Sequence, residues 1–132
     1  MKKVTLPKLK AKALKLYTEL VKLKAERDGK LNCYTCPAKL ELHTNNCQLG
    51  HYLSRGGYPG LTFHPDNSRL QCYRCNCLLH GNTVEFRYQL IREIGIERVE
   101  QLEAARHLPI KLGRSDYEKL IEHLQSEIKE LK

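Results

Sequence analysis

The sequence predicts an α+β protein in which α-helices flank a small core held together by a metal ion. Three observations support this fold class. Apolar residues recur at helical spacing near both ends of the chain, and the middle, residues 31–80, is rich in Cys, His, Asn, Gly and Pro. Two CxxC pairs frame that middle segment. We therefore divide the chain into a basic N-terminal helix (1–30), a zinc-bound core (31–82) and a C-terminal helical region (83–132).

The first thirty residues carry most of the positive charge. Ten Lys or Arg and three Asp or Glu give them a net charge of +7, within a chain total of +8. A basic arm on a nearly neutral body favours a nucleic-acid partner, with Lys8, Lys12 and Lys15 as DNA contacts, although a solvated lysine-rich helix would show the same charge. The chain lacks Trp and has two Phe, so a small apolar core would benefit from a metal.

Cellular location follows from what the sequence lacks. No apolar run approaches the roughly 18 residues that a membrane span requires, and the N-terminus lacks the pattern of a secretory signal. We expect a cytoplasmic protein with no membrane partner. In that reducing compartment, six cysteines indicate metal binding rather than disulfides.

Helices are expected at both ends of the chain. Residues 6–28 place apolar side chains at alternating steps of three and four, and Pro7 and Gly29 suit the two helix ends. The last helix is expected to open with a capping box over residues 115–118, and it repeats the same spacing up to Leu131. These two apolar faces could pair with each other or across a homodimer, and the sequence does not choose between them.

The middle of the chain predicts short elements. Residues 49–53 and 68–72 are the strand candidates, joined by a loop rich in Gly and Pro, and residues 73–80 are expected to form a short helix. Asn82 and Glu85 fit the N-cap and third position of a helix that ends at Gly95. A further helix is expected over residues 97–107.

The two CxxC pairs predict a structural zinc site. Four thiolates suit the tetrahedral sulfur coordination that Zn²⁺ prefers, and the metal would close a loop of 35 intervening residues. The ligands would be Cys33, Cys36, Cys72 and Cys75. Unliganded reduced cysteines are the alternative interpretation. Cys47 and Cys77 fall outside the pattern and are expected to be buried as small apolar side chains.

Histidine and asparagine residues lie in and next to the loop closed by zinc. They occur in Gln48-x-Gly50-His51-Tyr52, Phe63-x-x-Asp66-Asn67 and Gln71-Cys72-x-x-Cys75-Asn76, followed by Gly81-Asn82 and Ile91-x-x-Ile94-Gly95. Residues 33–82 resemble the HNH, or His-Me finger, nucleases in their histidine–asparagine–asparagine form, and the zinc frame is similar to that of phage endonuclease VII. Over residues 30–100 the chain is similar to the NinG/Rap family of lambdoid phages. The resemblance implies a ββα-metal core.

The residue types suit phosphodiester hydrolysis. A neutral imidazole at His51 could act as general base, and the amide oxygen of Asn76 could bind a catalytic Mg²⁺ or Mn²⁺. The resemblance implies that Asn67 braces the loop that carries His51. Arg55 could bind a phosphate. A structural histidine at position 51, a turn cap at position 67 and a helix N-cap at position 76 are the plain alternatives.

One departure from the HNH pattern concerns the catalytic metal. Many of these enzymes have an acidic residue just before the catalytic histidine, whereas this chain has Gly50, as the NinG/Rap family also does. If residues 73–80 are helical, His80 lies one turn after Asn76 and could supply the second ligand. Glu85 is a weaker candidate because helix capping already explains it.

Three functions remain open. The first is a structure-selective endonuclease that resolves branched DNA such as Holliday junctions during phage recombination, and paired cuts would imply a homodimer. The second is a general HNH nicking enzyme acting on duplex DNA. The third is a non-catalytic zinc-knuckle protein that binds DNA, which predicts that His51→Ala leaves function intact.

Overall fold

The computed structural model describes residues 3–132, so residues 1 and 2, including the basic Lys2, lie outside it. The fold combines four α-helices with one small sheet and three short helical turns, in a mixed α+β arrangement. In chain order the main elements are α1 (Leu6–Arg27), β1 (Gln48–His51), β2 (Ser68–Gln71), α2 (Thr83–Ile94), α3 (Ile96–Ala105) and α4 (Arg114–Leu131).

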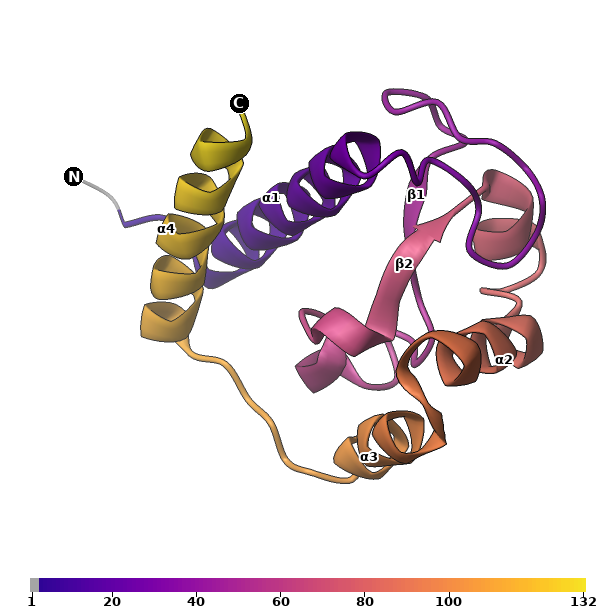
Figure 1. Cartoon of the computed structure of the whole chain (residues 1–132). Coiled ribbons are helices and arrows are strands. Elements are labelled where there is room, and N and C mark those ends of the chain that lie inside the picture. Colours follow the sequence, from indigo (N-terminus) through magenta and orange to yellow (C-terminus); the bar gives the residue numbers. More distant parts are fainter. Residues whose placement is uncertain (1–2) are drawn as a thin grey trace.

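Helices α1 and α4 lie side by side and pack through their apolar faces (Figure 1). The buried side chains at this contact are Leu9, Ala13 and Leu20 of α1 and Tyr117, Ile121, Leu124 and Ile128 of α4. The two heptad-spaced faces therefore pair within one chain, which settles the alternative that the sequence left open.

The ends of these two helices test the predicted start and stop signals. Pro7 lies in the first turn of α1, and Gly29 follows the helix with φ +68°, a conformation that favours glycine. The predicted capping box at residues 115–118 is wrong. Helix α4 begins at Arg114, and the Asp116 carboxylate accepts the Gly113 N–H at 2.8 Å.

Strands β1 and β2 form an antiparallel pair between the two helix pairs, α1 with α4 and α2 with α3 (Figure 1). Gln48 lies opposite Gln71, and His51 lies opposite Ser68. Both strands lie close to the predicted ranges but are shorter. Just beyond the strand pair, the Tyr52 N–H still donates a hydrogen bond to the Asn67 carbonyl oxygen, at 2.9 Å.

Helices α2 and α3 cover the loop that follows β1. Phe86 and Leu90 of α2 and Val99 and Leu102 of α3 form one buried cluster with Leu53 and Leu61 from that loop. Gly95, with φ +90°, separates the two helices. This cluster supports the segment that immediately follows His51.

The chain between β2 and α2 differs from its prediction. Instead of a helix over residues 73–80, a short π-helical turn covers Arg74–Leu78, and His80 and Asn82 both adopt positive φ values, of 51° and 48°. Asn82 is the N-cap residue of α2 and Glu85 lies in its first turn, as predicted, but the side-chain capping bonds expected of this pair are absent. The Asn82 side chain donates to the Thr35 carbonyl at 3.3 Å, and Glu85 instead accepts from Gln89 at 2.9 Å. Asn82 is therefore used for tertiary contact.

Across residues 3–132, none of the helices combines the length and the apolar character needed to cross a membrane.

Candidate metal centre and catalytic pocket

The four cysteines of the two CxxC pairs converge on one point. Their Sγ atoms all lie within 4.8 Å of one another, and the Sγ atoms of Cys36 and Cys72 are 3.7 Å apart. Four sulfurs at about 2.3 Å around a tetrahedral zinc ion would be separated by about 3.8 Å. The donor set and its spacing therefore fit a structural zinc ion, with Cys33, Cys36, Cys72 and Cys75 as its four ligands.

The thiols of this cluster differ in acidity. Burial raises the pKa of Cys33, but hydrogen bonds from the backbone of Cys72 and from Thr35 outweigh it and bring that pKa down to about 7. Burial raises the pKa of Cys36 to about 12 and also raises that of Cys72. Metal uptake must therefore release protons, which makes zinc affinity dependent on pH.

The two remaining cysteines lie outside the cluster. Cys47 is buried, as predicted. The prediction for Cys77 is wrong, because this side chain is exposed on the π-helical turn and its thiol donates to Gln48 Oε1 at 3.2 Å.

A separate polar pocket of about 250 Å³ holds four of the predicted site residues. His51, Arg55, Asn76 and His80 line it together with Leu49, Ser54 and Gly81. Strand β1 and the following loop supply one wall, and the chain from Asn76 to Gly81 supplies the other. His80 reaches the pocket through the left-handed turn around Gly81 rather than along a continuous helix.

His51, the last residue of β1, is held in a defined orientation. Its Nε2 lies 2.9 Å from the carbonyl oxygen of Thr62. A carbonyl can only accept, so Nε2 carries the hydrogen and Nδ1 keeps a lone pair. Burial lowers the pKa of His51, the Thr62 carbonyl partly offsets that effect, and Arg55 lowers the pKa further. The imidazole is therefore neutral near pH 7, with Nδ1 free to accept a proton.

Asn67 lies beneath the pocket rather than in its wall, and its side chain is fully buried. Its Nδ2 donates to the carbonyl oxygens of Leu53, at 2.9 Å, and Leu61, at 3.1 Å, while its Oδ1 accepts the Leu53 N–H at 2.8 Å. These bonds join the two ends of the loop that follows His51. A role in bracing that loop fits these bonds better than a local turn cap does.

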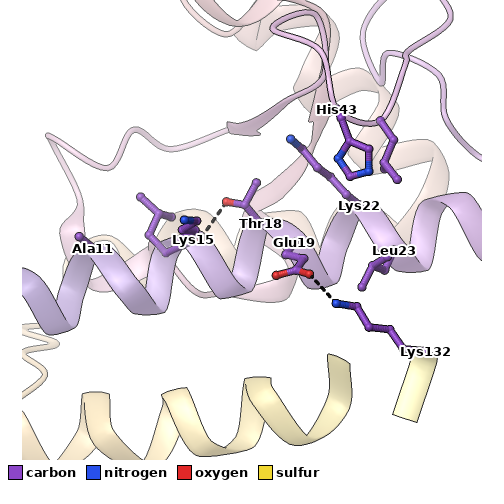
Figure 2. A pocket seen from close by; sticks show the side chains of 10 residues that line it. Ala11, Lys15, Thr18, Glu19, Lys22, Leu23, His43 and Lys132 are labelled. Atoms are coloured by element: carbon purple, nitrogen blue, oxygen red, sulfur yellow. Dashed lines mark hydrogen bonds and ion pairs between the residues drawn. The ribbon is translucent and has the colours of Figure 1, made fainter. Parts of the chain in front are cut away.

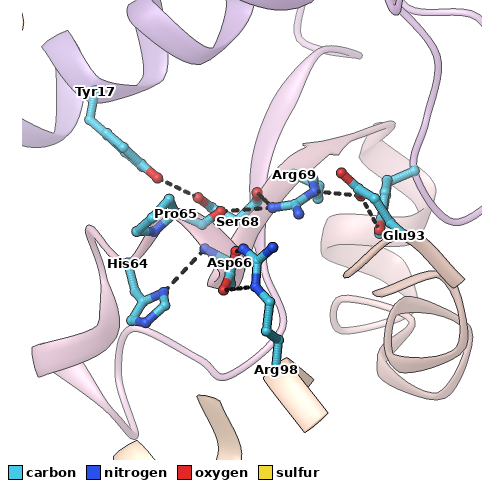
Figure 3. Close-up of polar contacts among 9 residues, drawn as sticks. Tyr17, His64, Pro65, Asp66, Ser68, Arg69, Glu93 and Arg98 are labelled. Carbon is cyan, nitrogen blue, oxygen red and sulfur yellow. Dashed lines mark hydrogen bonds and ion pairs between the residues drawn. The ribbon is translucent and has the colours of Figure 1, made fainter. Parts of the chain in front are cut away.

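The segment around Asn67 is fixed from two sides (Figure 3). The Tyr17 hydroxyl of α1 hydrogen-bonds with Ser68 Oγ at 2.7 Å, and Arg98 of α3 pairs with Asp66. Arg69 pairs with Glu93 of α2 at 3.1 Å. Both helix pairs therefore hold the start of β2 in place.

Asn76 has its amide oriented by Gln48. Its Nδ2 donates to Gln48 Oε1 at 2.8 Å, and its Oδ1 makes no hydrogen bond to any of residues 3–132. That oxygen remains available to a cation or to solvent. Gln48 was not among the predicted site residues, although it opens the motif that contains Gly50 and His51.

Gly50 is required by the packing of Gln71. A Cβ atom at position 50 would lie 1.8 Å from Gln71 Oε1. The Gln71 side chain is fully buried, and its Nε2 donates to Thr35 Oγ1 at 2.9 Å and to the Gly81 carbonyl at 2.8 Å. Gln71 therefore fills the space that a side chain at position 50 would enter. One signal of this role is visible in the sequence, where Gln71 directly precedes Cys72.

Gln71 Oε1 is a buried oxygen with no hydrogen-bond partner within the described chain. Gln71 is not among the residues that line the pocket, which itself offers the free Oδ1 of Asn76 and the imidazole of His80 as oxygen and nitrogen donors. Mg²⁺ and Mn²⁺ prefer such oxygen ligands. The amide oxygen and the imidazole in the pocket are donor types that such cations accept, and position 50 adds no carboxylate to them.

The predicted DNA-contacting lysines lie elsewhere, on α1. Lys8, Lys12 and Lys15 are exposed. Lys15 also lines a groove of about 690 Å³ between α1, the loop at Leu42 and His43, and the end of α4, where Lys132 pairs with Glu19 at 3.3 Å (Figure 2). This groove shares no lining residue with the pocket around His51.

The family model described as "Bacteriophage Lambda NinG protein" matches residues 2–132. The chain belongs to the NinG family. The family membership predicted from the sequence motifs is thereby confirmed.

Curated relatives extend this finding to individual phages. Proteins named "Protein ninG" from Escherichia phage lambda and Salmonella phage P22 are each 37% identical over 79 residues, which cover 60% of this chain and 37% of theirs. The corresponding protein of Enterobacteria phage H19B is 35% identical over the same length, or 38% of its own chain. The chain thus matches a little over a third of the length of these NinG relatives. No solved structure matches it.

The cysteine cluster predicts how zinc content responds to substitution. Wild-type protein should bind a single zinc ion per chain, measured by elemental analysis of the purified protein. Cys72→Ser should lose that ion and unfold at lower denaturant concentration, because one tetrahedral ligand is gone. Cys77→Ser is the matched control and should keep the zinc. Equal zinc content in both variants would contradict the assignment.

The close approach of Gln71 to Gly50 predicts a sharp steric effect. Gly50→Ala should lower the free energy of unfolding by about 1–3 kcal/mol, because the new methyl group must displace the Gln71 amide. Gly56→Ala is the control, since a Cβ at that position meets no atom within 4 Å. Denaturant titration of both zinc-loaded variants measures the difference, and equal stability would show that Gln71 does not occupy this space.

Proposed function

We propose that this NinG-family chain is a metal-dependent DNA endonuclease of the HNH, or His-Me finger, type. Strands β1 and β2 with the π-helical turn would form its ββα-metal core. One observation carries the proposal. His51 donates its Nε2–H to the Thr62 carbonyl, which leaves Nδ1 as a neutral base in the pocket shared with Asn76, His80 and Arg55. A purely structural role for His51 would not explain why Asn76, His80 and Arg55 line the same pocket.

Four side chains of the pocket have a role in this proposal. Nδ1 of His51 takes a proton from the attacking water, and burial keeps that nitrogen unprotonated near neutral pH. Arg55, exposed at the rim, binds a phosphate oxygen. Asn76 Oδ1 and His80 hold Mg²⁺ or Mn²⁺. When bound, that ion would stabilise negative charge on the phosphate and on the leaving 3′ oxygen.

Asn67 acts at a distance in this scheme. It keeps the loop after His51 closed through its bonds to Leu53 and Leu61, so the imidazole stays aligned with Thr62. The bound zinc ion fixes the ends of the same segment and takes no part in the reaction.

The substrate proposal rests on the family resemblance. We propose branched DNA, such as a Holliday junction formed in phage recombination in the host cytoplasm, cut by a homodimer. Lys8, Lys12 and Lys15 would add phosphate contacts, which give affinity without sequence preference. A general nicking activity on duplex DNA would use the same pocket.

Cleavage of end-labelled DNA tests the proposal. Zinc-loaded protein in Mg²⁺ should make paired cuts in a four-way junction and leave a matched linear duplex intact. His51→Ala should slow cleavage by about 10²–10⁴-fold, the typical contribution of a general base. The control is His123→Ala, because His123 lies on α4 and pairs only with Glu127.

Two other results would change the conclusion. Equal cutting of junction and linear duplex would retain the nuclease and remove the junction selectivity. No cutting of either substrate, with zinc bound and with Mn²⁺ also tried, would contradict the enzyme proposal and favour a DNA-binding zinc protein.

A further inference from the structure

Two apolar side chains are exposed on the turn that joins two residues of the catalytic pocket. Leu78 is 61% exposed and Leu79 is 40% exposed. They lie between Asn76 and His80, which both line the pocket. Exposed leucines at the rim of a polar site are candidates for contact with a partner, because water solvates them poorly.

The backbone holds these leucines in a fixed place. The Leu79 N–H donates to the Arg74 carbonyl at 2.8 Å, and the Gly81 N–H donates to the Cys75 carbonyl at 2.8 Å. Cys75 belongs to the zinc cluster, so the segment that presents the leucines is tied to the most constrained part of the chain. The backbone hydrogen bonds of the turn therefore determine that the two leucines are exposed.

The charges around the leucines indicate what kind of partner covers them. Arg74 is exposed on the same π-helical turn as Leu78, and Arg55 is exposed in the lining of the pocket. That lining also includes His80 but no acidic residue. A negatively charged polymer would complement the positive charge of this surface. A second copy of the chain would bring the same positive charges to it.

We propose that Leu78 and Leu79 form an apolar edge that contacts the uncovered faces of DNA bases at a strand branch. This inference rests on the proposed nuclease function and adds the element that would recognise the substrate. In a linear duplex the base faces are stacked on one another, whereas a branch point leaves some of them open. Leucine side chains can cover such faces or insert between base steps.

The test compares DNA binding by two variants in a His51→Ala background, so that the DNA stays intact. Leu78→Ser/Leu79→Ser should weaken binding to a four-way junction by about tenfold, equivalent to about 1.4 kcal/mol, and leave binding to linear duplex unchanged. A 2-aminopurine placed at the branch point should brighten with the parent protein, because its stacking is disturbed, and should stay dim with the double variant.

The matched control is Leu108→Ser, since Leu108 is also 61% exposed but follows α3 and is not part of the turn between Asn76 and His80. Zinc content of all variants should be unchanged. Equal junction binding by the double variant and its parent would overturn the inference, as would an equal loss on both DNAs or no junction preference in the parent. A change in oligomeric state on sedimentation would overturn it in favour of a protein interface.

Junction cleavage by the wild-type chain in Mg²⁺ reports the nuclease proposal separately. If junction binding depends on the leucines but no cleavage occurs, the nuclease proposal alone is contradicted. If cleavage occurs but junction binding does not depend on the leucines, the inference about the apolar edge alone is contradicted.

Discussion

Convergence of four cysteine thiols is the constraint on which the rest of the structure depends. Cys33 and Cys36 precede both strands, and Cys72 and Cys75 follow them, so a single zinc ion held by the four thiolates would fix the two ends of the segment that contains His51 and Asn67. The segment has only two four-residue strands and a few helical turns. A short sheet of that size is not stable alone, and closing the loop by metal lowers the entropy of its unfolded state.

Hydrogen bonds connect this cluster to the pocket. Thr35 lies between two of the cysteines and accepts from Gln71, which also donates to the Gly81 carbonyl at the pocket wall. Asn82 contacts both the Thr35 carbonyl and the Cys75 sulfur. The helices complete the frame, because Tyr17 of α1 and Arg98 of α3 hold the residues on either side of Asn67. The position of His51 thus follows from the zinc cluster and from both helix pairs.

Much of this arrangement could be predicted from the sequence, because it depends on spacing along the chain. The CxxC pairs, the apolar repeats of α1 and α4, and the ends of α1 at Pro7 and Gly29 are local patterns with one physical interpretation. The predicted capping boxes were less reliable. Asn82 has the right residue type for a cap, but its side chain is used by Thr35 and Cys75 instead, and such competition is invisible in a local pattern.

The remaining features depend on contacts between distant segments. Gly50 meets the Gln71 side chain diagonally across the strand pair, and this contact requires the register of the two strands. The entry of His80 into the pocket requires a left-handed turn in place of a helix. The exposure of Cys77 has the same origin, since a π-helical turn places it differently from the predicted helix. Side-chain identity indicated the candidates for the site, and only the fold could show which of them share a pocket.

The central claim is that the loop closed by zinc holds His51 in the tautomer and orientation of a general base. The tautomer of His51 tests this claim most directly. Long-range ¹H–¹⁵N correlation spectra of the zinc-loaded protein should show Nε2 protonated and Nδ1 bare, with an imidazole pKa below its ordinary value because the ring is buried. On removal of zinc, the signal should revert to the mixed tautomers of an exposed histidine with a pKa near the ordinary value. A proton on Nδ1 in the zinc-loaded protein, or a spectrum that zinc removal leaves unchanged, would contradict the account.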